Sequence, residues 1–411
     1  MINQSFIRRE AYLEMIGNYI DKPVIKVITG MRRSGKSAIL ALLREELLER
    51  KVDEERIIFL NFESQRLAAL ADTESLYKYV TEYAQKSPGR LYILLDEVQR
   101  ITGWERTVAS FRVDFDCDIY VTGSNANLLS GELHTLLAGR FVEIPVYPLS
   151  FAEHLVFTKA KGEDGGKDLN TQFIDYLRYG GLPGIHEMDI NSGTVYPYLT
   201  DIFNSVILKD VIGRHHIRDT ELLERIVKFL MDNMGHIFSA KSISDFLKNQ
   251  GRKLSTETVY NYLDALEEAF LIRKISRYDI KGKRQLETQE KYFFEDHGVK
   301  HAIQGYRDNE ISGLLENLVC MELKRRGFRV YIGQLGQREV DFIALRREEK
   351  IYIQVCYLLS DSAVIEREFA PLLEIKDQYP KLVLSMDPIW DYTKEGVRRK
   401  NLAEWLIKKI P

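Results

Sequence analysis

A glycine-rich run near the start of the chain has the residue types and spacing of a phosphate-binding loop. The run reads Gly30-Met31-Arg32-Arg33-Ser34-Gly35-Lys36-Ser37 and is followed by Ala38. Glycines in such a turn let successive main-chain N–H groups face one anion, where a following helix adds its dipole. Lysine at this position reaches the β- and γ-phosphates, and the serine hydroxyl ligates Mg²⁺. The run therefore predicts binding of a nucleoside triphosphate, with Lys36 on the phosphates and Ser37 on the metal.

A second reactive group is the acidic pair Asp96-Glu97, which directly follows the apolar run 91–95. Parallel sheets bind ligands at the carboxyl ends of their strands. There Asp96 would hold Mg²⁺ and Glu97 would act as the catalytic base that polarises the attacking water. An acidic pair alone is a weak signal, because acidic loop residues are common. Together with the phosphate loop it predicts hydrolysis of the nucleotide.

Polar residues also follow the strand expected at 118–122. Ser124 and Asn125 would lie between the phosphate loop and the acidic strand, where a polar side chain contacts the attacking water or the γ-phosphate. Ordinary turn chemistry within 123–127 is the alternative interpretation.

Hydrolysis at such sites also uses a guanidinium for the developing charge. Arg140 is the candidate, with Arg32 and Arg33 as alternatives, and each of them could instead make a structural ion pair. The sequence leaves open whether Arg140 acts on its own nucleotide or on that of a neighbouring copy.

The elements that would position these residues alternate between strand and helix, the pattern of a parallel α/β sheet. Strands are expected at 24–29, 56–61, 91–95, 118–122 and 141–146, with helices at 8–20, 36–50, 74–86 and 104–113. The chain of 411 residues is long enough for two to four domains.

Bulk composition excludes several classes of protein. The net charge of −3 gives no general attraction to nucleic acid or membrane, so any basic surface must be local. No apolar run approaches the roughly 18 residues of a membrane span. Three widely separated cysteines, Cys117, Cys320 and Cys356, favour reduced thiols over a disulfide framework. We therefore expect a cytoplasmic protein without a membrane partner.

With these residues in place, the chain resembles a family of bacterial and archaeal AAA-type (STAND-like) P-loop ATPases with a C-terminal domain of unknown function. The resemblance spans nearly the whole chain. Besides the phosphate loop, it rests on segments 95–99, 122–124, 138–140, 148–151, 180–183, 291–296, 339–342 and 353–357. It implies an α/β multidomain fold: a P-loop NTPase parallel sheet, a helical and winged-helix middle, and an α/β restriction-endonuclease-like C-terminal domain. The expected parts are an ATPase domain (1–155), a helical connector (156–216), a winged helix (217–297) and the endonuclease-like part (298–411).

The winged-helix part raises the question of DNA. Segment 237–270 reads as helix, turn, helix, with Ser255 capping the second helix. The second helix carries acidic residues and neither lysine nor arginine, which opposes groove reading. The segment after it is basic, and Lys281, Lys283 and Arg284 have the look of a wing tip that could grip phosphates without sequence specificity. Packing on the ATPase core or on another protein is the alternative use of this part.

The strands of the endonuclease-like part lack some of the residues that such a nuclease site needs. Such a site uses two carboxylates for Mg²⁺ and a lysine that activates water. Glu316 would lie on a helix and Asp341 on a strand, but the next strand offers Gln354 and Cys356, which share one face. A neutral amide is a weak ligand for a hard cation, and a thiol supplies no positive charge. We therefore expect an inactive scaffold.

The leading hypothesis is a switch that binds ATP and Mg²⁺, hydrolyses ATP slowly or when stimulated by a partner, and passes the nucleotide state to the later domains. A nucleotide-binding regulatory module with negligible turnover and an active DNA-cleaving effector are the alternatives. The absence of an Asn-Lys-x-Asp motif favours ATP over GTP without deciding it. A protein partner or a homo-oligomer is also compatible with the sequence.

Overall fold

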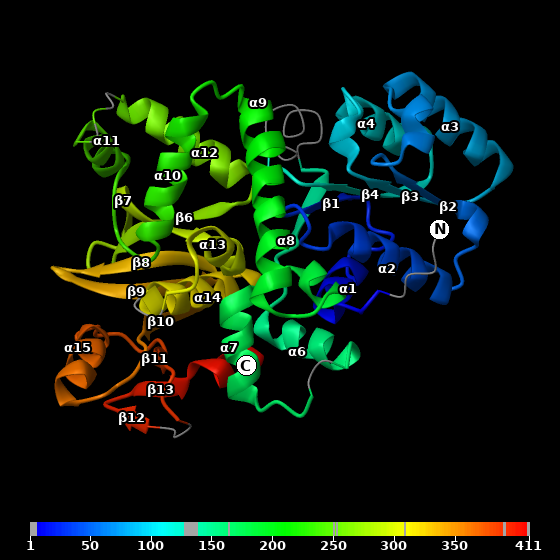
Figure 1. Cartoon of the computed structure of the whole chain (residues 1–411). Helices are drawn as coiled ribbons and strands as arrows, with labels where there is room; N and C mark the ends of the chain where they lie inside the picture. Colours follow the sequence, from blue (N-terminus) through cyan, green and yellow to red (C-terminus); the bar gives the residue numbers. More distant parts are fainter. Residues whose placement is uncertain are drawn as a thin grey trace. The chain divides into compact units, whose positions relative to one another are not determined.

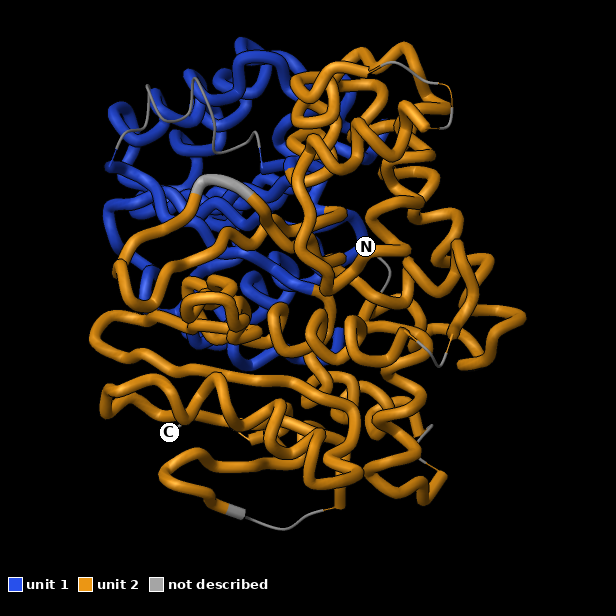
Figure 2. The backbone as a smooth tube through the Cα atoms, turned by 90° about the vertical axis from the view of Figure 1, so that its left-hand side faces the viewer, with its two compact units in different colours: residues 1–147, 268–270 blue, residues 148–267, 271–411 orange. Residues whose placement is uncertain are grey.

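The computed structural model describes residues 6–126, 139–162, 165–249, 251, 254–307, 310–388 and 392–408. Asn127 and Ala138, which end and begin two of the motifs above, lie outside these residues. The chain divides into two compact units, which Figure 2 colours separately. The first unit contains residues 1–147 and 268–270, and the second contains residues 148–267 and 271–411.

The first unit is built on a five-stranded sheet in which all neighbouring strands are parallel. Its strands are β1 (Ile25–Thr29), β2 (Ile57–Asn61), β3 (Leu91–Asp96), β4 (Cys117–Gly123) and β5 (Phe141–Pro145), in the order β2-β3-β4-β1-β5. Its helices are α1 (Glu10–Gly17), α2 (Lys36–Glu49), α3 (Thr73–Lys86) and α4 (Trp104–Asp114), which Figure 1 labels. The short 3₁₀ segments Glu54–Arg56, Gln65–Leu70 and Val98–Arg100 join these elements.

Helices cover both faces of this sheet. Successive apolar side chains of each strand point to opposite faces, so both faces are apolar. On β3, Ile93 packs with residues of α3 and α4, whereas Leu94 packs with residues of α1 and α2. The strands expected from the sequence are confirmed, each within one residue at either end. The opening helix is shorter than the expected 8–20, because it begins at Glu10 and ends at Gly17.

The second unit begins with helices. These are α6 (Phe151–Ala160), α7 (Leu169–Tyr179) and α8 (Ser192–Ser205), which continues through the π-helical turn Val206–Ile212 into α9 (Gly213–His215). The 3₁₀ segment Pro183–Glu187 lies between α7 and α8. Across the described residues, every helix is too short or too polar to cross a bilayer.

Three helices and a hairpin follow. The helices are α10 (Thr220–Asp232), α11 (Ala240–Asn249) and α12 (Thr256–Glu268), and the hairpin pairs β6 (Ile272–Asp279) with β7 (Arg284–Phe294). The Ser255 hydroxyl accepts a hydrogen bond from the Thr258 amide at 3.1 Å, as expected for a residue that caps α12.

The rest of the second unit continues the sheet that the hairpin begins. Its elements are α13 (His297–Gln304), α14 (Ile311–Arg325), β8 (Arg329–Leu335), β9 (Arg338–Arg346), β10 (Glu349–Val355), α15 (Ser362–Leu373), β11 (Lys381–Ser385), β12 (Tyr392–Lys394), β13 (Val397–Asn401) and α16 (Leu402–Ile407). The eight strands run in the order β12-β13-β11-β10-β9-β8-β6-β7. Because β6 pairs with β8, one sheet runs across the expected junction between parts 217–297 and 298–411.

Candidate active site

The phosphate loop connects β1 to α2 and contains several residues with left-handed backbone angles. Gly30, Arg33 and Gly35 have φ values of 145°, 67° and 101°. A Cβ atom on Gly30 would lie 2.1 Å from the main-chain oxygen of Val146, so this position excludes a side chain. Met31 and Ser34 are buried, whereas Ser37 at the start of α2 is exposed. The loop therefore has a fixed main chain, and the Ser37 side chain is accessible to a ligand.

The amino end of α2 suits an anion. Gly35 precedes the helix, no side chain caps its first N–H groups, and its first turn carries no acidic residue. Those groups and the helix dipole are thus available to a phosphate. The Lys36 ammonium donates to the main-chain oxygens of Gly30 and Met31, both at 3.0 Å. The phosphate-binding residues that the sequence indicated therefore form one site.

A residue that the sequence reasoning missed also holds the loop. Arg9, just before α1, is buried, and its guanidinium donates to the main-chain oxygens of Ser34 at 2.9 Å and Tyr147 at 3.0 Å. It also lies 4.4 Å from the ring centre of Tyr12, whose hydroxyl accepts the Tyr147 N–H at 3.0 Å. No local motif distinguishes Arg9 from Arg8, so its role becomes visible with the packing of the opening helix.

Asp96 ends β3 and is held by neutral donors. Its carboxylate accepts hydrogen bonds from the Asn61 amide at 2.8 Å and the Thr122 hydroxyl at 2.5 Å. Burial raises the pKa of Asp96, while hydrogen bonds from Thr122 and Ser37 and the charge of Lys36 act in the opposite direction. The Ser37 hydroxyl and the Asp96 carboxylate, the two proposed metal ligands, thus lie in contact. Asn61 had no part in the sequence argument.

Glu97 lies one residue further on and is also buried. Its N–H donates to the Thr122 hydroxyl at 2.9 Å, and its carboxylate accepts a hydrogen bond from the Gln99 amide. Strand β4 lies between β1 and β3, so its carboxyl end delivers Ser124 and Asn125 between the loop and the acidic pair. Both residues are buried, and the Ser124 hydroxyl has no hydrogen-bond partner among the described residues. A buried hydroxyl of this kind is available to a bound ligand.

Arg140 is not brought to this site. It precedes β5, and its main-chain oxygen accepts the N–H of Ile25 at 2.9 Å, at the start of β1. Because β1 and β5 are parallel, Arg140 lies at the amino ends of these strands, whereas the phosphate loop follows the carboxyl end of β1. A strand of this length spans about 16 Å, beyond the reach of an arginine side chain. Arg140 is exposed there, away from the phosphate loop of its own sheet.

The alternative arginines lie in the loop itself. The Arg32 guanidinium is 4.0 Å from the carboxylate of Glu63, which also lies 3.4 Å from that of Arg100. Arg33 is exposed and adopts left-handed backbone angles. Arg32 thus makes the ion pair that the sequence allowed as an alternative to catalysis.

Comparisons with known proteins agree with this geometry. Residues 22–155 match the family model described as "AAA domain", and residues 170–310 match a "Domain of unknown function". The chain is 38% identical to an uncharacterized protein of Haemophilus influenzae, over 99% of this chain and 100% of that protein. The two proteins belong to one family. An uncharacterized protein of Methanocaldococcus jannaschii, MJ1544, is 29% identical over 98% of this chain and 90% of its own length.

Among solved structures, the chain is similar to the Aeropyrum pernix ORC1 protein in complex with DNA, with 14% identity and a TM-score of 0.34. The match covers 75% of this chain and 95% of that chain. AMPPCP-bound DnaA from Aquifex aeolicus matches with 16% identity and a TM-score of 0.32, over 64% and 90% of the two chains. The parallel sheet with the loop after β1 and the family match identify a P-loop ATPase fold at the start of the chain.

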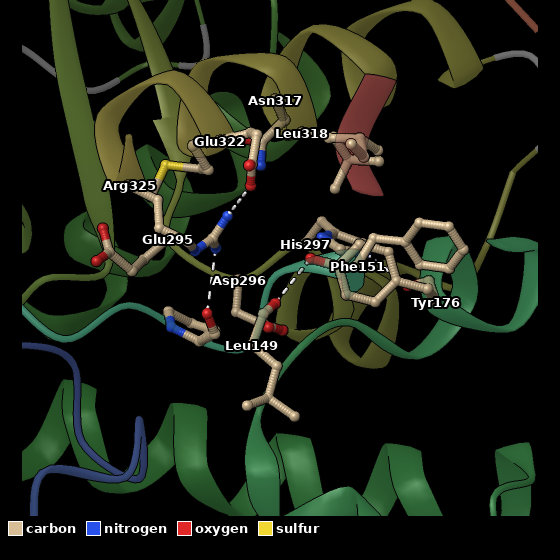
Figure 3. A pocket seen from close by; sticks show the side chains of 13 residues that line it. Leu149, Phe151, Tyr176, Glu295, Asp296, His297, Asn317, Leu318, Glu322 and Arg325 are labelled. Atoms are coloured by element: carbon tan, nitrogen blue, oxygen red, sulfur yellow. Dashed lines mark hydrogen bonds and ion pairs between the residues drawn. The ribbon is translucent and has the colours of Figure 1, made fainter. Parts of the chain in front are cut away.

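Three of the segments on which the resemblance rests, 148–151, 180–183 and 291–296, meet in the second unit, and Figure 3 shows residues of the first and the last. Asp296 accepts hydrogen bonds from the N–H groups of Gly181 at 2.7 Å and Val299 at 3.2 Å. The Arg325 guanidinium donates to the main-chain oxygen of Pro148 at 3.1 Å, and the Tyr176 hydroxyl to that of Leu149 at 2.8 Å. The cavity beside them is small, with room for about one water molecule. Hydrogen bonds therefore join these segments inside the second unit. Their spacing in the sequence did not predict these contacts.

The endonuclease-like residues also come together in the second unit. Glu316 from α14, Asp341 from β9 and Gln354 from β10 line an open hollow of about 420 Å³, with Cys356 just beyond β10. The Asp341 carboxylate accepts the Val355 N–H at 2.7 Å, and the Gln354 side-chain oxygen accepts the Asp341 N–H at 3.3 Å. Burial raises the pKa of both Asp341 and Glu316. Burial also raises the pKa of the Cys356 thiol to about 12, which keeps it protonated.

One step of the sequence argument about this cluster was wrong. The argument counted no cation, but Lys291 of β7 supplies one from outside the expected strand. Its ammonium is buried and lies 2.8 Å from the Glu316 carboxylate and 2.5 Å from that of Glu339. Burial opposes its charge, yet Glu316, Asp341 and Glu339 outweigh that effect and raise the pKa of Lys291. The cluster therefore has a lysine, and that lysine is paired with Glu316 and Glu339.

The basic segment is less available than its composition suggested. Arg273 pairs with Glu295 at 2.7 Å, Lys274 lies 3.7 Å from Glu290, and Lys291 is buried. Lys281, Lys283 and Arg284 at the turn of the hairpin are exposed. Within 273–291, the fully exposed lysine and arginine side chains are those of this turn.

Proposed function

We propose that this protein is a molecular switch that binds ATP with Mg²⁺ and hydrolyses the ATP. The observation that carries the proposal is the convergence of Lys36, Ser37, Asp96 and Glu97 at the carboxyl edge of one parallel sheet. The uncapped start of α2 and the left-handed backbone of Gly30 and Gly35 fit a phosphate group. The contact between the Ser37 hydroxyl and Asp96 fits Mg²⁺, which takes a few protein oxygens and completes its shell with phosphates and water.

Each residue would have a distinct part in the reaction. Bound Mg²⁺ would neutralise charge on the β- and γ-phosphates. Glu97 would accept a proton from the attacking water while Lys36 stabilises charge on the phosphate oxygens. Ser124 and Asn125 would hydrogen-bond the water or the γ-phosphate from between the loop and Glu97. Arg140 would act on the nucleotide of a neighbouring copy, because it lies at the amino ends of the strands in its own sheet.

A nucleotide-binding module with negligible turnover is the competing function. Release of phosphate by the purified chain with ATP and Mg²⁺ separates the two. We expect slow release by the wild type, loss of about 100-fold or more in Glu97→Gln, and binding of a fluorescent ATP analogue by both. Nucleotide binding without release, with or without DNA, would support the module instead. Parallel titrations with ATP and GTP test the expected preference for ATP.

We propose that α10, α11, α12 and the β6–β7 hairpin act as a winged helix that contacts a protein partner or a second copy. The acidic α12 and the internal pairing of Arg273, Lys274 and Lys291 support this use over groove reading. DNA contact would then involve the turn residues Lys281, Lys283 and Arg284 without sequence specificity. Three phosphate contacts give a slope of about −2.7 in log affinity against log salt. A slope of that size, lost when all three become alanine, would establish DNA association.

We propose further that the endonuclease-like part does not cleave DNA. Gln354 is a neutral ligand, and Lys291 already neutralises Glu316. Among the described residues, no group of three or more His, Cys, Asp or Glu is arranged to hold a metal ion. We expect no Mg²⁺-dependent cleavage of supercoiled DNA by the purified chain. Cleavage that Asp341→Ala abolishes would overturn this proposal.

A further inference from the structure

We propose that Gln99 is a positioning residue that orients the carboxylate of Glu97 for catalysis. The inference rests on the proposed hydrolysis and adds to it a residue that neither the sequence argument nor the family comparisons assign. The Gln99 amide nitrogen donates to one carboxylate oxygen of Glu97 from the short turn Val98–Arg100. The two side chains belong to one turn, so the contact does not depend on distant packing.

The main chain at Glu97 shows that its position is imposed by its surroundings. Its φ of 55° lies in the left-handed region, which costs a side-chain-bearing residue roughly 1 kcal/mol. The hydrogen bond from its N–H to the Thr122 hydroxyl of β4 holds the main chain there. Such strain persists where the rest of the structure fixes it, and it concentrates at functional sites. Gln99 fixes the remaining freedom, the rotation of the Glu97 side chain.

The neighbouring acid is held in a different way. Asp96 accepts hydrogen bonds from Asn61 of β2 and Thr122 of β4, so the sheet itself orients it. Among the described residues, Gln99 is the side chain that hydrogen-bonds the Glu97 carboxylate. Loss of Gln99 would therefore leave the Asp96 ligand in place and release the Glu97 base.

The chemistry of a general base explains why an amide suits this role. One carboxylate oxygen must face the attacking water, and the other can accept a fixed donor without losing the negative charge. An amide donor carries no charge, whereas a lysine or arginine would make Glu97 a weaker base through ion pairing. The Gln99 side-chain oxygen is buried and has no hydrogen-bond partner among the described residues. A buried acceptor of this kind is readily satisfied by an ordered water molecule.

A double-mutant cycle tests the proposal in the full chain. Gln99→Met keeps the length of the side chain and removes the amide, and Gln99→Glu adds a like charge beside Glu97. We expect Gln99→Met to lower kcat about tenfold and Gln99→Glu to lower it further, with the dissociation constant of a fluorescent ATP analogue unchanged within about twofold. In the Glu97→Gln background, Gln99→Met should have no additional effect. Gln85→Met on the exposed face of α3 is the matched control.

The outcomes separate this proposal from the proposed function. Absence of turnover in the wild type would overturn both, because Gln99 would have no reaction to assist. Turnover in the wild type with unchanged kcat in Gln99→Met would overturn the role of Gln99 alone. An equal loss of kcat in both backgrounds, or a weaker nucleotide affinity that accounts for the loss, would also overturn it. Thermal unfolding of each variant shows whether the fold is retained, and Gln99→Glu supplies the comparison if Gln99→Met is unstable.

Discussion

The phosphate loop of the first unit and the acidic cluster of the second contain similar ingredients in different arrangements. In the first, Lys36 donates to the main-chain oxygens of Gly30 and Met31, and Asp96 accepts from neutral donors. In the second, Lys291 makes direct ion pairs with Glu316 and Glu339. A charged group held by neutral partners can still interact with a charged ligand. A group in an internal ion pair already has its counter-charge within the protein. The same residue types are therefore open to a ligand in one unit and paired internally in the other.

Removing the lysine of the second unit should have the largest effect on stability. Lys291→Met would leave the largely buried Glu316 carboxylate without its cation, which costs about 3–5 kcal/mol of unfolding free energy. ATP hydrolysis per folded molecule should stay at the wild-type rate. Urea unfolding and phosphate release measure the two effects, with Lys376→Met at an exposed position as the control. An unchanged unfolding midpoint would contradict the ion-pair interpretation of the cluster.

The matching change in the first unit should have the opposite profile. Lys36→Met removes the cation from the phosphates, so ATP hydrolysis should fall about 100-fold or more. The free energy of unfolding should change by less than about 1 kcal/mol, because the hydrogen bonds lost go to main-chain oxygens at a loop. If Lys36→Met instead destabilised the chain as strongly as Lys291→Met, the contrast between the two sites would fail.

Acid should affect the second unit through its buried histidines. Burial lowers the pKa of His154 to about 3 and that of His186 to about 4, from an ordinary value of 6.5. Between pH 6.5 and the lowered pKa of each histidine, the unfolded chain binds a proton that the folded chain does not. The folding stability present above pH 6.5 is therefore lost as the pH falls. At pH 5 the loss is about 2 kcal/mol for each histidine.

Unfolding free energies at pH 7 and pH 5 measure this dependence. His154→Phe keeps an aromatic ring against Phe151 and Tyr176 and removes one titrating group. Its pH 7 to pH 5 difference should be smaller than that of the wild type by about 2 kcal/mol. Equal differences in the two proteins would show that His154 carries no part of the acid sensitivity.

Much of the first unit could be predicted from the sequence because its signals are local. Apolar runs at strand spacing, the glycine turn and the acidic pair each lie within a few neighbouring residues, and the parallel fold brings their carboxyl ends to one edge. The sequence thereby determined the phosphate loop, the acidic strand and the place of Ser124 beside them. It also identified the helix capped by Ser255 and the hairpin turn with its exposed cations.

Tertiary structure decided the features that depend on residues far apart in the chain. Arg9 reaches Ser34 and Tyr147, and Lys291 reaches Glu316 and Glu339, through contacts that no local pattern encodes. The parallel pairing of β1 with β5 places Arg140 at the edge away from its own loop. The sequence determines which side chains carry charge. Which strands become neighbours determines whether a charged side chain faces a ligand or an internal partner. This difference in strand pairing separates the candidate active site from the acidic cluster of the second unit.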